Sequence, residues 1–201
     1  MIDEGYIKFK SNWKKTLPLE FSGFKKLNHF RDEMYQLHLI GAYDNGIGFG
    51  NISIRKKNSN QFYISGSATG NFSILDNSHY SLVTNISIKD NLLDCMGSII
   101  ASSESMSHAV IYKNCPWVNG VIHIHSLALW QKLLYKIPTT SKNIRYGTPE
   151  MALAIIELLE NEDTLKQKIF AMAGHEEGIF VFGNDLKSAK ETLLKHLGVE
   201  S

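Results

Sequence analysis

The chain has 201 residues, of which 43% are hydrophobic and 20% are charged, a composition that predicts one globular domain spanning residues 1–201. Its net charge of +1 provides no general basic surface, and no apolar run approaches the roughly 20 residues of a membrane helix, so we expect neither nucleic acid nor a membrane as partner. The first residues lack the charged-then-apolar pattern of a signal peptide, and Cys95 and Cys115 are the only cysteines, which together predict a reduced, cytoplasmic protein without a disulfide framework.

The first half of the chain is predicted to contain one helix followed by strands. Apolar side chains recur at spacings of three and four over residues 21–40, which indicates a helix with one apolar face. The members of that face are Phe24, Leu27, Phe30, Met34 and Leu37. The glycine-rich stretch 45–50 ends the helix, because glycine adopts backbone angles that a helix cannot use. Strands are then predicted over residues 51–55, 61–65 and 82–88, with a hairpin loop at 56–60.

The second half mixes helices and strands without a strict βαβ rhythm. A short helix is predicted over residues 105–113 and a strand, rich in valine and isoleucine, over 117–125. A helix start is predicted at residues 148–150: Thr148 caps the helix, Pro149 takes its first position, and Glu150 interacts favourably with the helix dipole. This helix is expected to run to residue 159. Further elements are expected as one or two strands over 169–182, interrupted at 174–178, and a helix over 185–197. The expected fold class is therefore α+β, a largely antiparallel central sheet covered by helices.

Three histidines are candidates for a metal site. His123 and His125 lie two residues apart in a predicted strand, so their imidazoles project from the same face. Two neutral imidazoles at that spacing can share a divalent cation, and His175, flanked by glycines at the interruption of a strand, is a candidate third ligand. The alternative is two unrelated histidines on a polar strand face and an exposed loop histidine.

Glu104 is the candidate catalytic acid or base. It follows two serines and precedes a predicted helix. A carboxylate beside a divalent cation can coordinate the cation, or accept a proton when substrate displaces it. The alternative is a glutamate that merely interacts favourably with the helix dipole.

Two loops and one helix start could bind an anion. The stretches 48–51 and 69–71 offer backbone N–H groups and short polar side chains, and Ser102 and Ser103 add hydroxyls at a helix N-terminus. Each glycine loop, taken alone, is equally typical of an ordinary turn.

Taken in order, these segments resemble the class II aldolase/adducin family. The matching segments are Gly50-Asn51-Ile52-Ser53-Ile54-Arg55, Thr69-Gly70, Ser102-Ser103-Glu104 followed by His108 and Ile111-Tyr112, Val121 to Ser126, Tyr146 to Ala152, and His175. The resemblance extends from about Leu27 to the last helix.

The resemblance implies an α/β/α layered fold and a metal-dependent aldolase, a lyase that cleaves or forms a carbon–carbon bond in a small, phosphorylated sugar through a metal-stabilised enediolate. It implies a divalent metal, usually zinc, with manganese or cobalt as alternatives, held by His123, His125 and His175. It also implies Glu104 as catalytic acid/base, and a homotetramer with sites between subunits. The residues that it places around the substrate phosphate are Asn51, Thr69, Gly70, Ser102 and Ser103.

Some positions depart from the family pattern and leave alternatives open. Glu176 follows His175 where the family commonly has glycine. Three roles therefore stay open for Glu176 and Glu177: extra metal ligands, hydrogen-bond partners of the ligands, or surface charge. Gly48 stands where a threonine is common. An epimerase of the family usually has aspartate in place of Glu104, a dehydratase keeps the glutamate, and a non-catalytic adducin-like interaction module would need no metal ligands.

Aromatic residues flank the His-X-His strand and bear on assembly. They are Trp117, Trp130 and Tyr135. Aromatic side chains are enriched in protein interfaces, which favours the homotetramer that the resemblance implies, although core packing explains them equally well.

Overall fold

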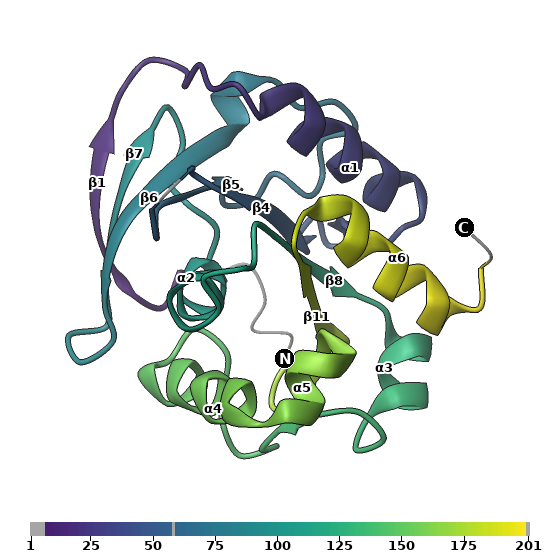
Figure 1. Ribbon diagram of the computed structural model, residues 1–201. Helices are drawn as coiled ribbons and strands as arrows, with labels where there is room; N and C mark the ends of the chain where they lie inside the picture. Colours follow the sequence, from purple (N-terminus) through teal and green to yellow (C-terminus); the bar gives the residue numbers. More distant parts are fainter. Residues whose placement is uncertain (1–6, 58, 200–201) are drawn as a thin grey trace.

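The computed structural model, which describes residues 7–57 and 59–199, is built around a nine-stranded sheet (Figure 1). From one edge to the other the strands are β1 (Lys10–Lys15), β7 (Leu92–Gly97), β6 (Tyr80–Ser87), β5 (Phe62–Ser65), β4 (Asn51–Arg55), β8 (Gly120–His125), β11 (Gly178–Gly183), β10 (Ile169–Met172) and β9 (Thr139–Thr140). Neighbours pair antiparallel except at the two edges, where β1 with β7 and β9 with β10 are parallel. The largely antiparallel sheet expected from the sequence is confirmed. A separate two-stranded sheet joins β2 (Gly41–Ala42) and β3 (Gly48–Phe49).

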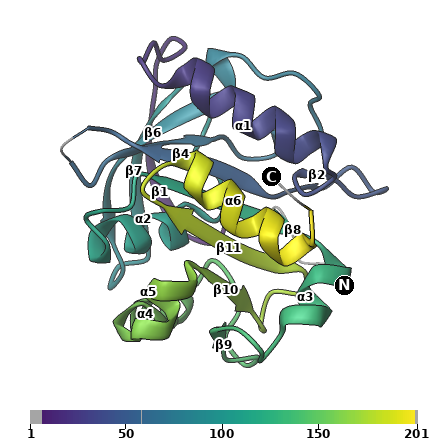
Figure 2. The same cartoon turned by 45° about the vertical axis from the view of Figure 1, so that its right-hand side comes forward.

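Helices cover both faces of the sheet, which confirms the α/β/α layers (Figures 1 and 2). One face carries α1 (Phe24–Gln36), α3 (Leu127–Leu133) and α6 (Leu186–Leu197). The other carries α2 (Ser105–Asn114), α4 (Pro149–Glu160) and α5 (Glu162–Gln167). A short 3-10 turn, Asn77–His79, precedes β6. Within the described residues, none of the helices has the length and apolar character that crossing a membrane requires.

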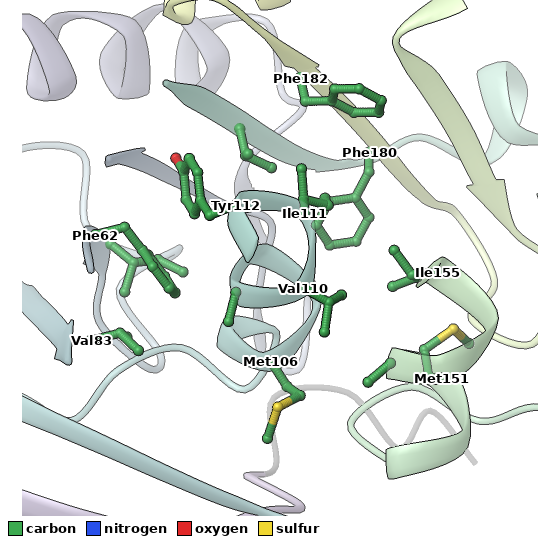
Figure 3. Close-up of a cluster of buried hydrophobic side chains, with 14 of the residues drawn as sticks. Phe62, Val83, Met106, Val110, Ile111, Tyr112, Met151, Ile155, Phe180 and Phe182 are labelled. Carbon is green, nitrogen blue, oxygen red and sulfur yellow. The ribbon is translucent and has the colours of Figure 1, made fainter. Parts of the chain in front are cut away.

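The alternation of side chains along the central strands divides the core into two layers. Ile122 and Ile124 of β8 pack with α1, α3 and α6, whereas Val121 packs with α2 and α4 on the opposite face. Phe180 and Phe182 of β11 join this second layer, which Figure 3 shows around α2. Burying each such side chain contributes about 1.5–3 kcal/mol. Because successive strand residues alternate, the histidines of β8 share the α2 face with Val121.

The structure differs from the sequence prediction at several boundaries. The first helix is shorter than the predicted span 21–40: it ends at Gln36, and His38 has a φ of +56° that a helix cannot continue through. Leu37, predicted on the apolar face, is therefore exposed. The strand predicted from Trp117 begins only at Gly120, because the preceding residues form the turn after α2.

The aromatic residues considered for an interface differ in their surroundings. Tyr135 is exposed and Trp117 is at the margin of exposure. The indole Nε1 of Trp130 donates to the backbone carbonyl of Met172, at 3.0 Å, so this ring is fixed to its own chain.

Candidate metal and anion-binding site

Three buried histidines converge at the end of the central strands. The pleat of β8 places His123 and His125 on one face, and the loop between β10 and β11 brings His175 to them. One ligand atom from each ring lies within 4.8 Å of the others. The loop follows this path because Gly174 has no side chain: a Cβ there would lie 1.8 Å from the carbonyl oxygen of Ile144. Three imidazoles at these separations could hold a metal ion.

The hydrogen-bond partners assign the tautomers of two of these rings. His123 Nδ1 lies 3.1 Å from the carbonyl oxygen of Ile179, which can only accept, so Nδ1 carries the proton. The Tyr43 hydroxyl donates its single proton to Glu177 Oε2 at 2.8 Å, so its oxygen accepts from His125 Nδ1 at 2.9 Å. Both Nε2 atoms, 3.2 Å apart, then carry lone pairs that face one another. Facing lone pairs repel, and a cation between or beside them removes that repulsion.

Burial also keeps these rings in the form that ligates a metal. Desolvation, together with the neighbouring histidines, holds the pKa values of His123 and His125 well below the ordinary value. Both are therefore neutral at pH 7. His123 stacks on Phe180, with centroids 4.2 Å apart, and His175 stacks on Tyr146 at the same separation, so the rings have little freedom to turn.

Glu104 is the N-cap residue of α2, directly before its first turn, and its side chain is 1% exposed. Its Oε1 atom is 3.7 Å from His175 Nδ1, and Ser107 Oγ donates to Oε2 at 3.0 Å. The carboxylate makes no capping hydrogen bond to the helix backbone. A helix-capping role therefore does not explain its burial beside the histidines.

A small polar pocket lies beside this cluster. It is lined by Gly48, Phe49, Gly50, Asn51, Gly66, Ser67, Ala68, Thr69, Gly70, Ser102 and Ser103. The set contains all five residues that the sequence predicts around an anion. Glycine is required at position 70, since a Cβ would lie 2.1 Å from the carbonyl oxygen of Gly41. The Thr69 hydroxyl donates to the carbonyl oxygen of Gly66 at 2.9 Å, so Thr69 holds the shape of its own loop.

A chain of buried hydrogen bonds orients Asn51 in this pocket. His108 Nε2 lies 2.6 Å from Asn51 Oδ1, which only accepts, so Nε2 carries the proton. His108 Nδ1 then accepts from Ser53 Oγ at 2.7 Å, and Ser53 Oγ accepts from the Tyr112 hydroxyl at 2.8 Å. Burial lowers the pKa of His108 to about 3, so the ring stays neutral. With its carbonyl oxygen engaged, Asn51 has its NH₂ group to offer to an anion.

Sequence reasoning missed Arg31, a buried cation behind the pocket. Its guanidinium comes from α1 and is 1% exposed. It donates to three carbonyl oxygens of the loop that follows Gly66, those of Thr69 (3.1 Å), Ser73 (3.2 Å) and Phe72. The signal was present in the helix pattern, because Arg31 is four residues after Leu27 and three before Met34, on the apolar face.

Comparisons with known proteins bear on the family of this chain. The family model described as "Class II Aldolase and Adducin N-terminal domain" matches residues 43–195. A protein of Mycoplasma pneumoniae named "Probable L-ribulose-5-phosphate 4-epimerase UlaF" is 24% identical, over 88% of this chain and 80% of that protein.

Solved structures with the same fold include an L-fuculose 1-phosphate aldolase, at a TM-score of 0.65 and 16% identity, over 89% of this chain and 85% of that one. The YgbL protein of Klebsiella pneumoniae aligns at a TM-score of 0.63 and 16% identity, over 85% of this chain and 83% of that one. At these identities the structural likeness shows the fold.

Proposed function

The chain belongs to the class II aldolase and adducin family, and from this premise we propose that it is a metal-dependent lyase that cleaves or forms a carbon–carbon bond in a small sugar phosphate. The observation that carries the proposal is the convergence of the His123 and His125 Nε2 lone pairs beside His175, with the buried carboxylate of Glu104 next to them. A surface interaction module has no need of such a buried, preorganised donor set.

His123, His125 and His175 would hold the divalent metal, for which we propose zinc, with manganese or cobalt as alternatives. When bound, the metal supplies positive charge that stabilises negative charge developing on substrate oxygens during aldol cleavage. The neutral, buried imidazoles are already in the protonation state that this ligation needs.

Glu104 would move a proton between the substrate hydroxyl and the carbon at which the bond breaks. A general acid/base must be fixed within reach of the reacting atoms, and Ser107 fixes one carboxylate oxygen. The other oxygen faces His175. Glu104 directly follows Ser102 and Ser103 of the proposed phosphate pocket in the chain, and its carboxylate is 3.7 Å from the proposed ligand His175.

Asn51, Thr69, Gly70, Ser102 and Ser103 would bind the substrate phosphate. The Asn51 amide and the serine hydroxyls are neutral donors, and the loop carrying Thr69 and Gly70 is held from behind by Arg31. Binding energy at the phosphate would orient the far end of the substrate against the histidines and Glu104.

Epimerisation of a sugar phosphate is the second candidate, because the similar Mycoplasma protein is named as a probable epimerase. The glutamate at position 104 favours the aldolase. We also propose a cytoplasmic homotetramer, for which light scattering at micromolar concentration should give four times the mass of one chain.

The distinguishing experiment incubates the purified protein with zinc, manganese or cobalt and a panel of phosphorylated and free sugars. An aldolase releases two carbonyl fragments, which a coupled reductase or a carbonyl reagent traps. An epimerase converts the sugar phosphate to a stereoisomer of the same mass and releases no fragment. Stereoisomer formation without fragments would replace the aldolase assignment by the epimerase.

A further inference from the structure

Glu177 and Tyr43 form a hydrogen-bonded chain that ends on a proposed metal ligand. Tyr43 donates its hydroxyl proton to Glu177 Oε2 at 2.8 Å, and its oxygen lies 2.9 Å from His125 Nδ1. Glu177 belongs to the same loop as His175, and its Oε2 is 3.9 Å from His125 Nδ1. We propose that Glu177 and Tyr43 are positioning residues that keep His125 in its metal-binding tautomer; this rests on the metal site proposed above.

The direction of the tyrosine proton decides which nitrogen of His125 can bind a metal. When the Tyr43 hydroxyl donates its proton to Glu177, the hydroxyl oxygen accepts from His125 Nδ1–H, and His125 Nε2 keeps its lone pair. If the Glu177 carboxylate is removed, the Tyr43 hydroxyl can rotate and donate its hydrogen bond to His125 Nδ1 instead. His125 would then carry its proton on Nε2, 3.2 Å from His123 Nε2, and a hydrogen bond between the two rings would close the metal site. Glu177 therefore favours the His125 tautomer whose Nε2 can bind a metal over the tautomer whose Nε2 carries the proton.

The backbone at Glu177 supports a role for its side chain. Its φ is +68°, a conformation that favours glycine and that few glutamates adopt. The conformation is maintained by a hydrogen bond from Ser126 N–H to the Glu177 carbonyl oxygen, at 3.1 Å. Glu176, the preceding residue, has an exposed side chain. A carboxylate at position 177 is thus present where the backbone alone would prefer glycine.

Aromatic packing holds the Tyr43 and His125 rings in place. Phe49 lies against both Tyr43, with centroids 4.7 Å apart, and His125, with centroids 5.5 Å apart. Tyr43→Phe would therefore keep the aromatic packing and remove only the hydroxyl. Glu177→Gly would relieve the backbone strain and remove the whole side chain, including the carboxylate.

The test measures Zn²⁺ affinity by competition with a chromophoric chelator, with the melting temperature of the metal-free protein measured beside it. Glu177→Gly and Tyr43→Phe should each weaken Zn²⁺ binding by about 10–100-fold, the usual effect of removing a partner of a ligating histidine. The melting temperature of metal-free Glu177→Gly should stay equal or rise, because glycine suits the backbone there. The double variant should lose little more affinity than either single variant, since both break one chain.

Two further variants separate this role from simple charge attraction. Glu177→Gln keeps an acceptor for the Tyr43 hydroxyl and should retain more affinity than Glu177→Gly. Glu176→Gln, the matched control, should bind Zn²⁺ as the wild type does. The inference is overturned if Glu177→Gly and Tyr43→Phe bind as tightly as wild type, if Glu177→Gln equals Glu177→Gly, or if Glu176→Gln shows the same loss. A folded wild type that binds no Zn²⁺ would instead overturn the metal site itself, and this inference with it.

Discussion

The Oε1 atom of Glu104 lies 3.7 Å from Nδ1 of His175, and both side chains are at most 3% exposed. This contact joins the N-terminal end of α2 to the loop between β10 and β11, two segments about 70 residues apart in the sequence. It places a carboxylate beside the proposed metal ligands, where proton transfer and metal binding can act on one substrate.

Replacement of Glu104 should affect chemistry far more than folding. Glu104→Gln keeps the shape of the side chain and removes the base, so kcat should fall by roughly 10²–10⁴-fold. Steady-state kinetics with the substrate found in the sugar panel measures this change, and circular dichroism melting monitors the fold. A variant that is fully active, or one that fails to fold, would contradict the assignment.

Removal of the Arg31 charge should weaken binding of the substrate phosphate. Arg31→Met removes the guanidinium that donates to the carbonyl oxygens of Thr69, Phe72 and Ser73, and it loosens the proposed phosphate loop. We expect KM, and the inhibition constant for inorganic phosphate, to rise by about tenfold, the equivalent of one charged hydrogen bond.

Arg55 provides the matched control for Arg31. It also donates to backbone carbonyl oxygens, those of Ser59, Tyr112, Cys115 and Val118, but these lie outside the pocket. Both Arg31→Met and Arg55→Met should lower the melting temperature, and only Arg31→Met should raise KM. An equal rise of KM in both variants would indicate a general loss of stability instead of a role in the pocket.

His108 should make the folded state sensitive to acid. Its pKa is about 3 in the folded protein and near 6.5 when unfolded. The unfolded chain therefore binds a proton first, so stability is complete above about pH 6.5 and falls as the pH decreases towards 3. Between pH 7 and pH 5 this group alone should reduce the free energy of unfolding by about 2 kcal/mol.

The measurement compares urea unfolding of the wild type and His108→Gln at both pH values. The other buried histidines with lowered pKa values, such as His123 and His125, are present in both proteins. The wild type should therefore lose about 2 kcal/mol more than the variant. Equal losses in the two proteins would show that His108 is not kept neutral by burial.

The sequence predicts the parts of this site that depend on local periodicity. The pairing of His123 with His125 follows from the two-residue repeat of a strand, and the glycines around His175 mark the loop that delivers it. Strand β1 escaped prediction because Lys10 to Lys15 shows no apolar alternation; it lies at the sheet edge, where such residues are exposed.

Sequence periodicity does not predict contacts between segments that are far apart in the chain. Tyr43 meets Glu177 across 134 residues, and Arg31 reaches Thr69 from a different element. Neither pair has a spacing that a helix or strand repeat would show. Sequence reasoning left Glu177 open between ligand, partner of a ligand and surface charge, and the folded chain places it against Tyr43.

The metal content of the purified protein tests the central claim most directly. Elemental analysis by mass spectrometry should find about one divalent metal per chain in the wild type, as expected for a single three-histidine site. A double variant, His123→Ala/His125→Ala, should retain almost none, because two of the three ligands are gone. Full retention of metal by the folded double variant would contradict the account.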